Sequence, residues 1–173
     1  ITAKEFLTSS ENIVNGVAKA IELYKPDGIP VIFDLQVEAE ALGCQLYWPD
    51  DNPPAVVSHP LSEGKTINEL TFLQNENGRI PLIMEAAKQL RLKYPKIALY
   101  GLITGPFTLA LHLTGTDIFL KMFEEPDFVH EIMSFSTNVA IFMVERYKES
   151  GCDIIALVDP MTSQIDPVSF ETF

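Results

Sequence analysis

The stretch Ile97–Pro106, with the sequence IALYGLITGP, decides the fold of this chain. Residues Ile97–Ile103 form an apolar run that is too short for a typical helix and is consistent with a strand buried on both faces. Thr104, Gly105 and Pro106 then end this run sharply and lead into a helix. The stretch therefore predicts a buried strand that passes directly into a helix.

Two similar units lie on either side of this stretch. Ile29–Phe33 is a short apolar run, mostly β-branched, and it ends in Asp34. A long helix is predicted from Pro126 until Gly151 stops it, and Asp153–Val158 then forms a third strand that ends in Asp159. Strands of this kind alternating with helices indicate a parallel sheet covered by helices, with right-handed crossovers. The predicted fold class is α/β.

Other segments complete this outline. Apolar spacing predicts helices over Thr2 to about Tyr24, Val37–Leu42 and Ile80–Lys93, and a new helix begins at Asp166-Pro167. On the long helix the predicted core stripe consists of Phe128, Ile132, Phe135, Val139 and Phe142. The segment from Tyr47 to about Asn68 is rich in Pro, Asp and Asn and predicts a long irregular excursion.

The length of 173 residues limits how these units can close into a sheet. A (β/α)₈ TIM barrel typically needs about 250 residues, so about three βα units form only part of one. An open doubly wound sheet would be expected to carry a G-x-G-x-x-G fingerprint or a P-loop, and the sequence has neither. We therefore expect residues 1–173 to be a single incomplete (β/α)₈ barrel.

Composition excludes several classes of function. The formal net charge is −12 and the isoelectric point is about 4.5, which argues against a nucleic-acid binder or a ligand of anionic membranes. The apolar runs are far shorter than the roughly 20 residues that span a bilayer, and no secretory signal opens the chain. Two cysteines, Cys44 and Cys152, cannot form a disulfide framework. The cytoplasm is the expected location.

Candidate site residues follow the predicted strands, because parallel α/β folds build their sites at the C-terminal ends of the strands. Asp34 and Asp159 can accept hydrogen bonds, hold a cation or share a proton, or each can cap the helix after its strand. The turn between the second strand and its helix can bring backbone close to a ligand. Its residues are Thr104, Gly105, Pro106, Phe107 and Thr108.

His112 lies within two turns of the start of the helix that follows this turn. Its imidazole can exchange protons near neutral pH, although a histidine on such a helix is more often structural. The cysteines and histidines have no zinc-site spacing, and no G-x-S-x-G elbow supplies a serine nucleophile.

The strand-end segments resemble the uroporphyrinogen decarboxylase superfamily. The resemblance covers the chain from about Asp27 onward. It is carried by Ile32-Phe33-Asp34 leading into Glu38–Gly43, by Gly105–Ala110, and by Ile155–Pro160 followed by Ser163–Pro167 and Phe170. The superfamily contains tetrapyrrole decarboxylases and zinc-dependent, corrinoid-linked thiol methyltransferases. Its members are (β/α)₈ barrels of roughly twice this length.

The resemblance implies a role for Asp34 and leaves two branches open. In the decarboxylases the matching aspartate contacts pyrrole N–H groups. Here, however, His112 stands in place of the pocket tyrosine and Asp159-Pro160 in place of a glutamate-serine pair. The only arginines, placed on or beside helices and not at strand ends, are Arg79, Arg91 and Arg146. A substrate with many carboxylates would need arginines at the mouth of the barrel, so the methyltransferase branch is favoured.

The resemblance thus implies methyl transfer between a corrinoid and a thiol, with Asp34, His112 and Asp159 as catalytic residues and Thr104–Thr108 as substrate-binding residues. It also implies zinc and corrinoid as cofactors, a small-molecule substrate and a corrinoid protein as partner. The family's zinc ligands lie in the other half of the barrel, so none is assigned here.

Three alternatives remain open: tetrapyrrole decarboxylation, a non-catalytic half-barrel that associates through its open edges, and an unrelated barrel that holds a divalent metal on the two aspartates.

Overall fold

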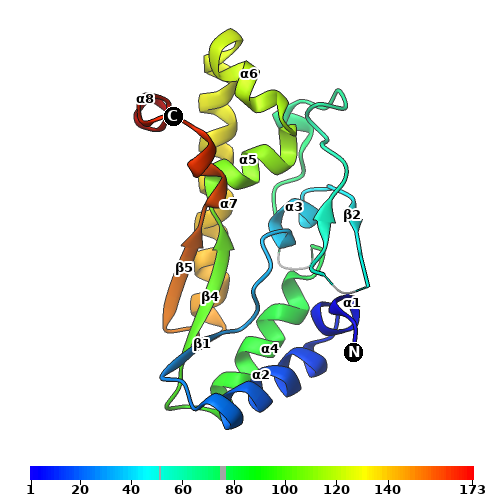
Figure 1. The fold of residues 1–173 in the computed structure, drawn as a ribbon, viewed down its shortest axis with the longest axis vertical. Helices are drawn as coiled ribbons and strands as arrows, with labels where there is room; N and C mark the ends of the chain where they lie inside the picture. The colour runs from blue at the N-terminus through cyan, green and yellow to red at the C-terminus, as the bar shows by residue number, and fades with distance from the viewer. Residues whose placement is uncertain (51, 75–76) are drawn as a thin grey trace.

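The computed structural model describes residues 1–50, 52–74 and 77–173. Its main sheet has three parallel strands in the order β1 (Gly28–Pro30), β4 (Ala98–Thr104) and β5 (Ile154–Val158). Ile29 pairs with Leu99, and Tyr100 pairs with Ile154. A separate antiparallel pair joins β2 (Leu46–Tyr47) to β3 (Ala55–Val56). Figure 1 shows β4 and β5 side by side with α7 behind them.

The strand order identifies the type of winding. Each strand of the main sheet lies next to the strand that follows it within that sheet, and the order does not reverse as it would in a doubly wound fold. Helix α4 lies between β1 and β4 in the chain, and α7 lies between β4 and β5. The predicted α/β class with parallel strands and helical crossovers is confirmed. The winding is that of a barrel segment.

Helices precede, connect and follow the strands of this sheet. Their bounds are α1 Ala3–Leu7, α2 Ser10–Tyr24, α3 Val37–Ala41, α4 Ile80–Lys93, α5 Pro106–Thr114, α6 Asp117–Glu124, α7 Pro126–Glu149 and α8 Pro167–Thr172, with 3₁₀ turns η1 Ile67–Glu69 and η2 Pro160–Gln164.

The first predicted helix is in fact two helices. Thr2 and Glu5 form a reciprocal capping box that starts α1. Ser9 then accepts a hydrogen bond from the N–H of Asn12 and starts α2. Two helix-start signals so close together interrupt a pattern of apolar spacing that is otherwise continuous. The helix predicted after Pro106 is likewise divided, into α5 and α6.

The strand β1 is shorter than the predicted run Ile29–Phe33. The N–H of Val31 still donates to the carbonyl of Tyr100, but the chain then leaves the sheet. Phe33 is 64% exposed, so this run is not buried on both faces. Asp34 therefore follows a short connecting segment instead of following the strand directly.

A close contact between β4 and α7 holds the central strand against its helix. A Cβ atom added at Gly101 would lie 2.2 Å from Cγ of Tyr147, which is fully buried. Any side chain at position 101 would push α7 away from the sheet. The glycine thus sets the distance between the two layers.

The predicted core stripe of α7 is displaced by one position. Phe128, Phe135 and Phe142 are only partly buried, whereas Val129 and Met143 are fully buried. Only Ile132 and Val139 of the predicted stripe belong to the buried face. The phenylalanines flank this face, and Phe72 packs edge-on against Phe135 and Phe142. Across the described residues, no helix is both long and apolar enough to cross a bilayer.

Candidate functional site

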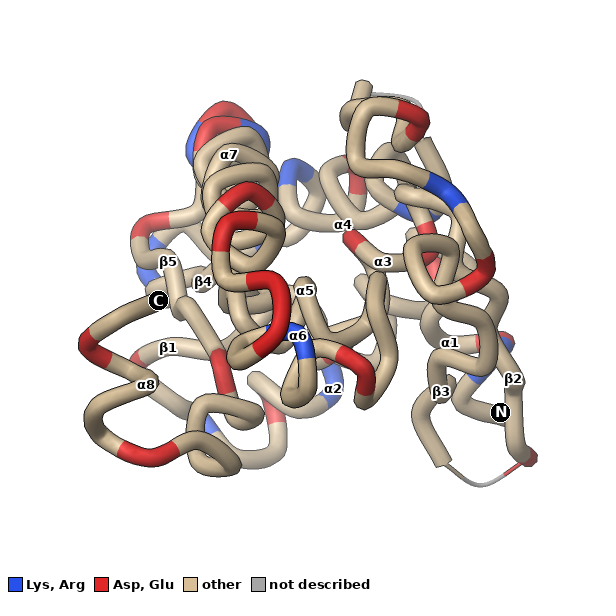
Figure 2. Tube along the Cα trace, turned by 90° about the horizontal axis from the view of Figure 1, so that it is seen from above, with Lys and Arg blue, Asp and Glu red and all other residues tan. Residues whose placement is uncertain are grey.

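The predicted site residues meet at one edge of the sheet, beyond the C-terminal ends of β4 and β5. The carboxylates of Asp34 and Asp159 both act electrostatically on the imidazole of His112, and both raise its pKa. The three predicted catalytic residues therefore lie close enough for their charges to interact. Figure 2, seen from above, shows acidic segments on α6, α7 and α8.

Asp159 caps the N-terminus of α5. Its Oδ2 accepts a hydrogen bond from the N–H of Phe107 at 2.9 Å, and its Oδ1 accepts from the N–H of Thr108 at 2.8 Å. The hydroxyl of Thr108 also donates to Oδ1, at 2.6 Å. A carboxylate at a helix N-terminus satisfies free N–H groups and complements the helix dipole. Asp159 follows β5, but it caps α5, which is the helix that follows the neighbouring strand β4.

Gly105 allows this cap to form. A Cβ atom built on Gly105 would lie 2.2 Å from Cβ of Asp159 and 2.4 Å from its Oδ2. No side chain fits between the turn and the carboxylate. The Gly-Pro pair that marks the turn in the sequence therefore serves the packing of Asp159 as well as the start of α5.

Asp34 is buried and fully engaged by its neighbours. It is 3% exposed, and its Oδ1 accepts a hydrogen bond from the N–H of Gln36 at 2.9 Å. Its Oδ2 pairs with Nη1 of Arg79 at 2.5 Å. The local bond to Gln36 is a turn contact, whereas the arginine comes from the start of α4.

The position of Arg79 corrects the expectation that every arginine lies away from the strand ends. Its guanidinium is buried, bonds Asp34, and donates from Nε to Oε2 of Glu40 at 2.6 Å. Its Cζ lies 5.0 Å from the ring centre of Trp48. The two carboxylates balance the charge of Arg79, while among the described residues its buried Nη2 has no hydrogen-bond partner.

The other two arginines lie elsewhere. Arg91 binds Asp153 and the carbonyl of Gly151, just before β5. Arg146 pairs with Glu149 near the end of α7.

His112 holds a neutral imidazole near this edge. Burial and then the nearby His59 lower its pKa to about 4, and the two aspartates oppose this effect only in part. Among the described residues its buried Nδ1 has no hydrogen-bond partner. The ring of His59 contacts the backbone carbonyl of His112 through Nδ1, at 2.8 Å. A neutral imidazole with an unused nitrogen can accept a proton or a hydrogen bond.

Sequence reasoning did not single out Glu38 as a site residue. This glutamate on α3 is 1% exposed, and both of its oxygens contact Thr104 at the end of β4. Burial raises its pKa, with Asp34 contributing in the same direction. The signals in the sequence are that Glu38 begins one of the segments that carry the family resemblance and that it stands between the apolar residues Val37 and Ala39, both of which are buried.

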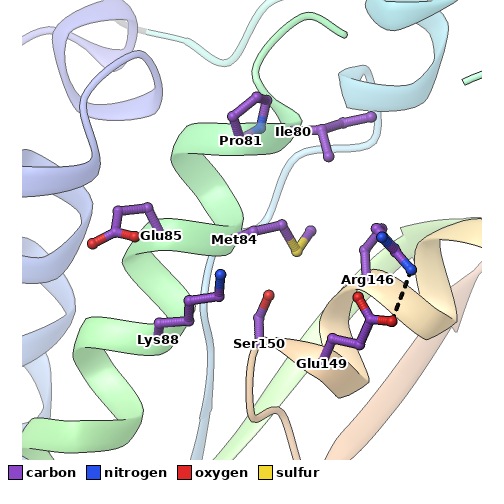
Figure 3. Close-up of a pocket in the computed structure, with 8 residues that line it drawn as sticks. All are labelled: Ile80, Pro81, Met84, Glu85, Lys88, Arg146, Glu149 and Ser150. Atoms are coloured by element: carbon purple, nitrogen blue, oxygen red, sulfur yellow. Dashed lines mark hydrogen bonds and ion pairs between the residues drawn. The ribbon is translucent and has the colours of Figure 1, made fainter. Parts of the chain in front are cut away.

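Two cavities lie close to these elements. The first, of about 320 Å³, lies between α4 and the C-terminal part of α7, and Figure 3 shows the Arg146–Glu149 pair at its side. It belongs to the helical layer and contains none of the candidate residues. The second, of about 430 Å³, is largely apolar and borders the candidate site through Pro106, Phe107 and Asp159. This second cavity fits a small substrate better because it adjoins the strand ends.

No group of three or more His, Cys, Asp or Glu side chains arranged to hold a metal ion occurs among residues 1–50, 52–74 and 77–173. Cys44 and Cys152 are free thiols, and burial raises the pKa of each to about 12. They are poor thiolate ligands at neutral pH.

Comparison with known proteins places these observations in a family. The sequence pattern of the family described as uroporphyrinogen decarboxylase (URO-D) matches residues 1–173, which is the whole chain. The chain belongs to the uroporphyrinogen decarboxylase family. The partial barrel is therefore the family's fold in this chain.

Relatives from two branches of the family are similar to the chain. The methylcobamide:CoM methyltransferase MtbA of Methanosarcina acetivorans is 32% identical over 139 residues, covering 79% of this chain and 41% of the relative. MtaA of Methanosarcina barkeri, another methylcobamide:CoM methyltransferase, is 31% identical, covering 89% of this chain and 47% of MtaA. The uroporphyrinogen decarboxylase of Aliarcobacter butzleri is 24% identical, and the match covers 88% of this chain and 46% of that decarboxylase.

A solved structure agrees with the predicted architecture. The structure described as a methyltransferase from Methanosarcina mazei superposes with a TM-score of 0.88 and 27% sequence identity. The match covers 96% of this chain and 51% of the other chain. The chain thus spans about half the length of the relatives it matches, and its fold is a partial barrel.

Proposed function

We propose that the full-length protein transfers a methyl group between a corrinoid and a thiol. The observation that carries this proposal is the difference in similarity between the two branches. Methylcobamide:CoM methyltransferases share 31–32% identity with the chain, whereas uroporphyrinogen decarboxylases share 22–24%. The substrates follow from the names of those relatives: a methylated corrinoid carried by a partner protein, and a small thiol of the coenzyme M class.

The electrostatics of the candidate site support the same branch. The carboxylate of Asp34 is buried and already bonded to Arg79 and to the N–H of Gln36, so part of its capacity to accept pyrrole N–H groups is taken up. The charge of Arg79 is balanced by Asp34 and Glu40. Among the described residues, no other arginine lies beside these carboxylates, so a polycarboxylate would meet a negative surface.

Within this proposal each candidate residue has a distinct role. Asp34, buried and fixed by Arg79, acts behind the surface of the site by holding the segment after β1 in place. The imidazole of His112 is neutral at pH 7 and, with a pKa of about 4, is a weak base, so its unpartnered Nδ1 serves as a hydrogen-bond acceptor and not as the base that deprotonates the thiol. Pro106 and Phe107 of the turn line the substrate pocket, and Asp159 holds the turn in place through Phe107 and Thr108.

Zinc is implied by the resemblance, and when bound it lowers the pKa of a substrate thiol. The described residues do not form a zinc site, so the fit is poor within this chain and no step through zinc is assigned to it. The residues present would serve the substrate and the corrinoid side of the pocket.

The test is an assay of the full-length protein with methylcobalamin and coenzyme M. We expect demethylation of the corrinoid, loss of activity with a chelator, and recovery on adding zinc. A parallel assay with uroporphyrinogen should release no CO₂. Release of CO₂ without any metal, together with no methyl transfer, would establish the decarboxylase alternative in place of this proposal.

We also place the protein in the cytoplasm, on the grounds that its two cysteines are unpaired thiols. Residues 1–173 are taken as a single incomplete barrel unit whose open edges associate with more protein. Ile154 and Leu157 of β5 are 49% and 57% exposed, which favours such contact. A purely non-catalytic assembly module would bury the same edges but show neither activity.

A further inference from the structure

The further inference concerns Glu38, a buried carboxyl group that the proposed chemistry does not use. Its Oε1 accepts a hydrogen bond from the N–H of Thr104 at 3.1 Å, and its Oε2 lies 2.7 Å from the hydroxyl of Thr104. The same hydroxyl lies 2.9 Å from the backbone carbonyl of Leu35. Glu38, Thr104 and Leu35 thus form a chain of oxygens that joins three segments of the site.

The number of hydrogens available along this chain favours a neutral carboxyl group. A threonine hydroxyl has one hydrogen to donate, and a backbone carbonyl can only accept. If the hydroxyl of Thr104 donates to Leu35, then the hydrogen between Oγ1 and Oε2 must belong to Glu38. A neutral acid satisfies all three contacts: Oε1 accepts, Oε2–H donates to Oγ1, and Oγ1–H donates to Leu35. An ionised glutamate would leave one oxygen contact without a hydrogen.

The charges around Glu38 favour the same state. Glu38 is 1% exposed, and the cation closest to this part of the site, Arg79, bonds Asp34 and Glu40 instead. The groups that act electrostatically with Glu38 are Asp34, after β1, and the hydroxyl of Tyr147, on α7. Asp34 is an acid, and the tyrosine pKa is itself raised well above its usual value by burial. Neither group stabilises a buried carboxylate.

We propose that Glu38 is held as a neutral carboxylic acid and acts as the positioning residue that fixes the Asp34 segment and α3 to the end of β4. Through Leu35 it restrains the residue next to Asp34, and through Thr104 it restrains the turn that begins α5. The single proton on Glu38 thus links two sides of the candidate site, the segment that carries Asp34 and the turn that begins α5. The inference does not depend on which reaction the site performs.

The variant Glu38→Gln tests the proposal in the full-length protein. A glutamine carries a carbonyl that can accept from the Thr104 N–H and an amide that can donate to its hydroxyl, so it copies the neutral acid. Glu38→Leu is the matched control because it keeps a similar volume and leaves the Thr104 N–H without a partner. We expect the Tm of Glu38→Gln to stay within about 2 °C of the wild type and that of Glu38→Leu to fall by about 4–8 °C.

Two readouts separate a protonated carboxyl group from a merely structural residue. First, the infrared difference between wild type and Glu38→Gln at pH 7 should contain the carbonyl band of a protonated carboxyl group. Second, the stability that Glu38 provides is fully present below its unfolded pKa and is lost as pH rises through its raised folded pKa. The Tm of the wild type relative to Glu38→Gln should therefore fall with rising pH.

Absence of the protonated carboxyl band at pH 7, or a Glu38→Gln variant as unstable as Glu38→Leu, would overturn the proposal. Methyl-transfer assays play no part in these outcomes, so a failure of the proposed function leaves this test intact.

Discussion

The side chains of the candidate site differ in whether their polar atoms are already used in hydrogen bonds. Asp159 directs both carboxylate oxygens at the start of α5, and Asp34 directs both at the segment around α3 and α4. His112, by contrast, keeps a ring nitrogen unused. At this scale the carboxylates shape the site, and the neutral imidazole keeps an unused hydrogen-bond acceptor.

Replacing Asp159 by Ala should destabilise the protein by about 1–3 kcal/mol, because it removes two backbone N–H contacts and the bond to Thr108. Chemical denaturation measures the loss. Asp166→Ala is the matched control, since Asp166 caps the short helix α8, which buries no residue. Equal losses of unfolding free energy in the two variants would show that the Asp159 cap stabilises the protein no more than the exposed cap of α8 does.

The burial of His112 predicts a dependence of stability on pH. Its folded pKa of about 4 lies below its unfolded value of 6.5, so the unfolded chain binds more protons between these values. The contribution is present above pH 6.5 and is lost as pH falls toward 4. We expect the unfolding free energy of the wild type to drop over this window more than that of His112→Gln. The exposed His130 serves as control, and His130→Gln should follow the wild-type curve.

Between elements, the decisive contact joins the segment after β1 to the start of α4. The sequence predicts α4 with its observed bounds, but it cannot predict that Arg79 at its N-terminus reaches Asp34, 45 residues earlier in the chain. Local patterns report spacing within an element, whereas this ion pair depends on how two elements pack. The one-position displacement of the α7 stripe has a related cause. Large phenylalanines dominate its pattern, while smaller residues such as Val129 and Val139 face the sheet.

Breaking this contact should be costly. Arg79→Met leaves Asp34 buried without its partner and should cost about 3–5 kcal/mol in unfolding free energy. Combining it with Asp34→Asn should recover much of the loss, because the uncompensated charge is then removed. Lys121→Met breaks the more exposed pair with Glu125 and should cost under about 1 kcal/mol. A double variant whose loss equals the sum of the single losses would show that the pair is not coupled.

At the scale of the whole molecule, the three strands make an open segment of a barrel. The class and the incompleteness of the barrel follow from the sequence, because each strand is a short apolar run and the length allows few of them, whereas the order of the strands comes from the structure. The edge of β5 leaves Ile154 and Leu157 exposed, although both stand in a run that indicates burial.

These exposed side chains predict that the chain 1–173 associates in solution. Sedimentation should show species larger than a monomer that increase with concentration, and Leu157→Lys should shift the distribution toward the monomer. Leu120→Lys, on α6, changes an equally exposed leucine away from the sheet and should have little effect. A compact monomer at all concentrations would refute this expectation.

The cap of α5 also has a consequence for synthesis on the ribosome. The carboxylate that satisfies the N–H of Phe107 is supplied 52 residues later in the chain. At about 5–20 residues per second, translation leaves the first turn of α5 without its cap for roughly 3–10 s. During that interval the nascent chain exposes free backbone donors beside an unfinished sheet. The arrival of Asp159 then completes the helix and the strand edge in a single step.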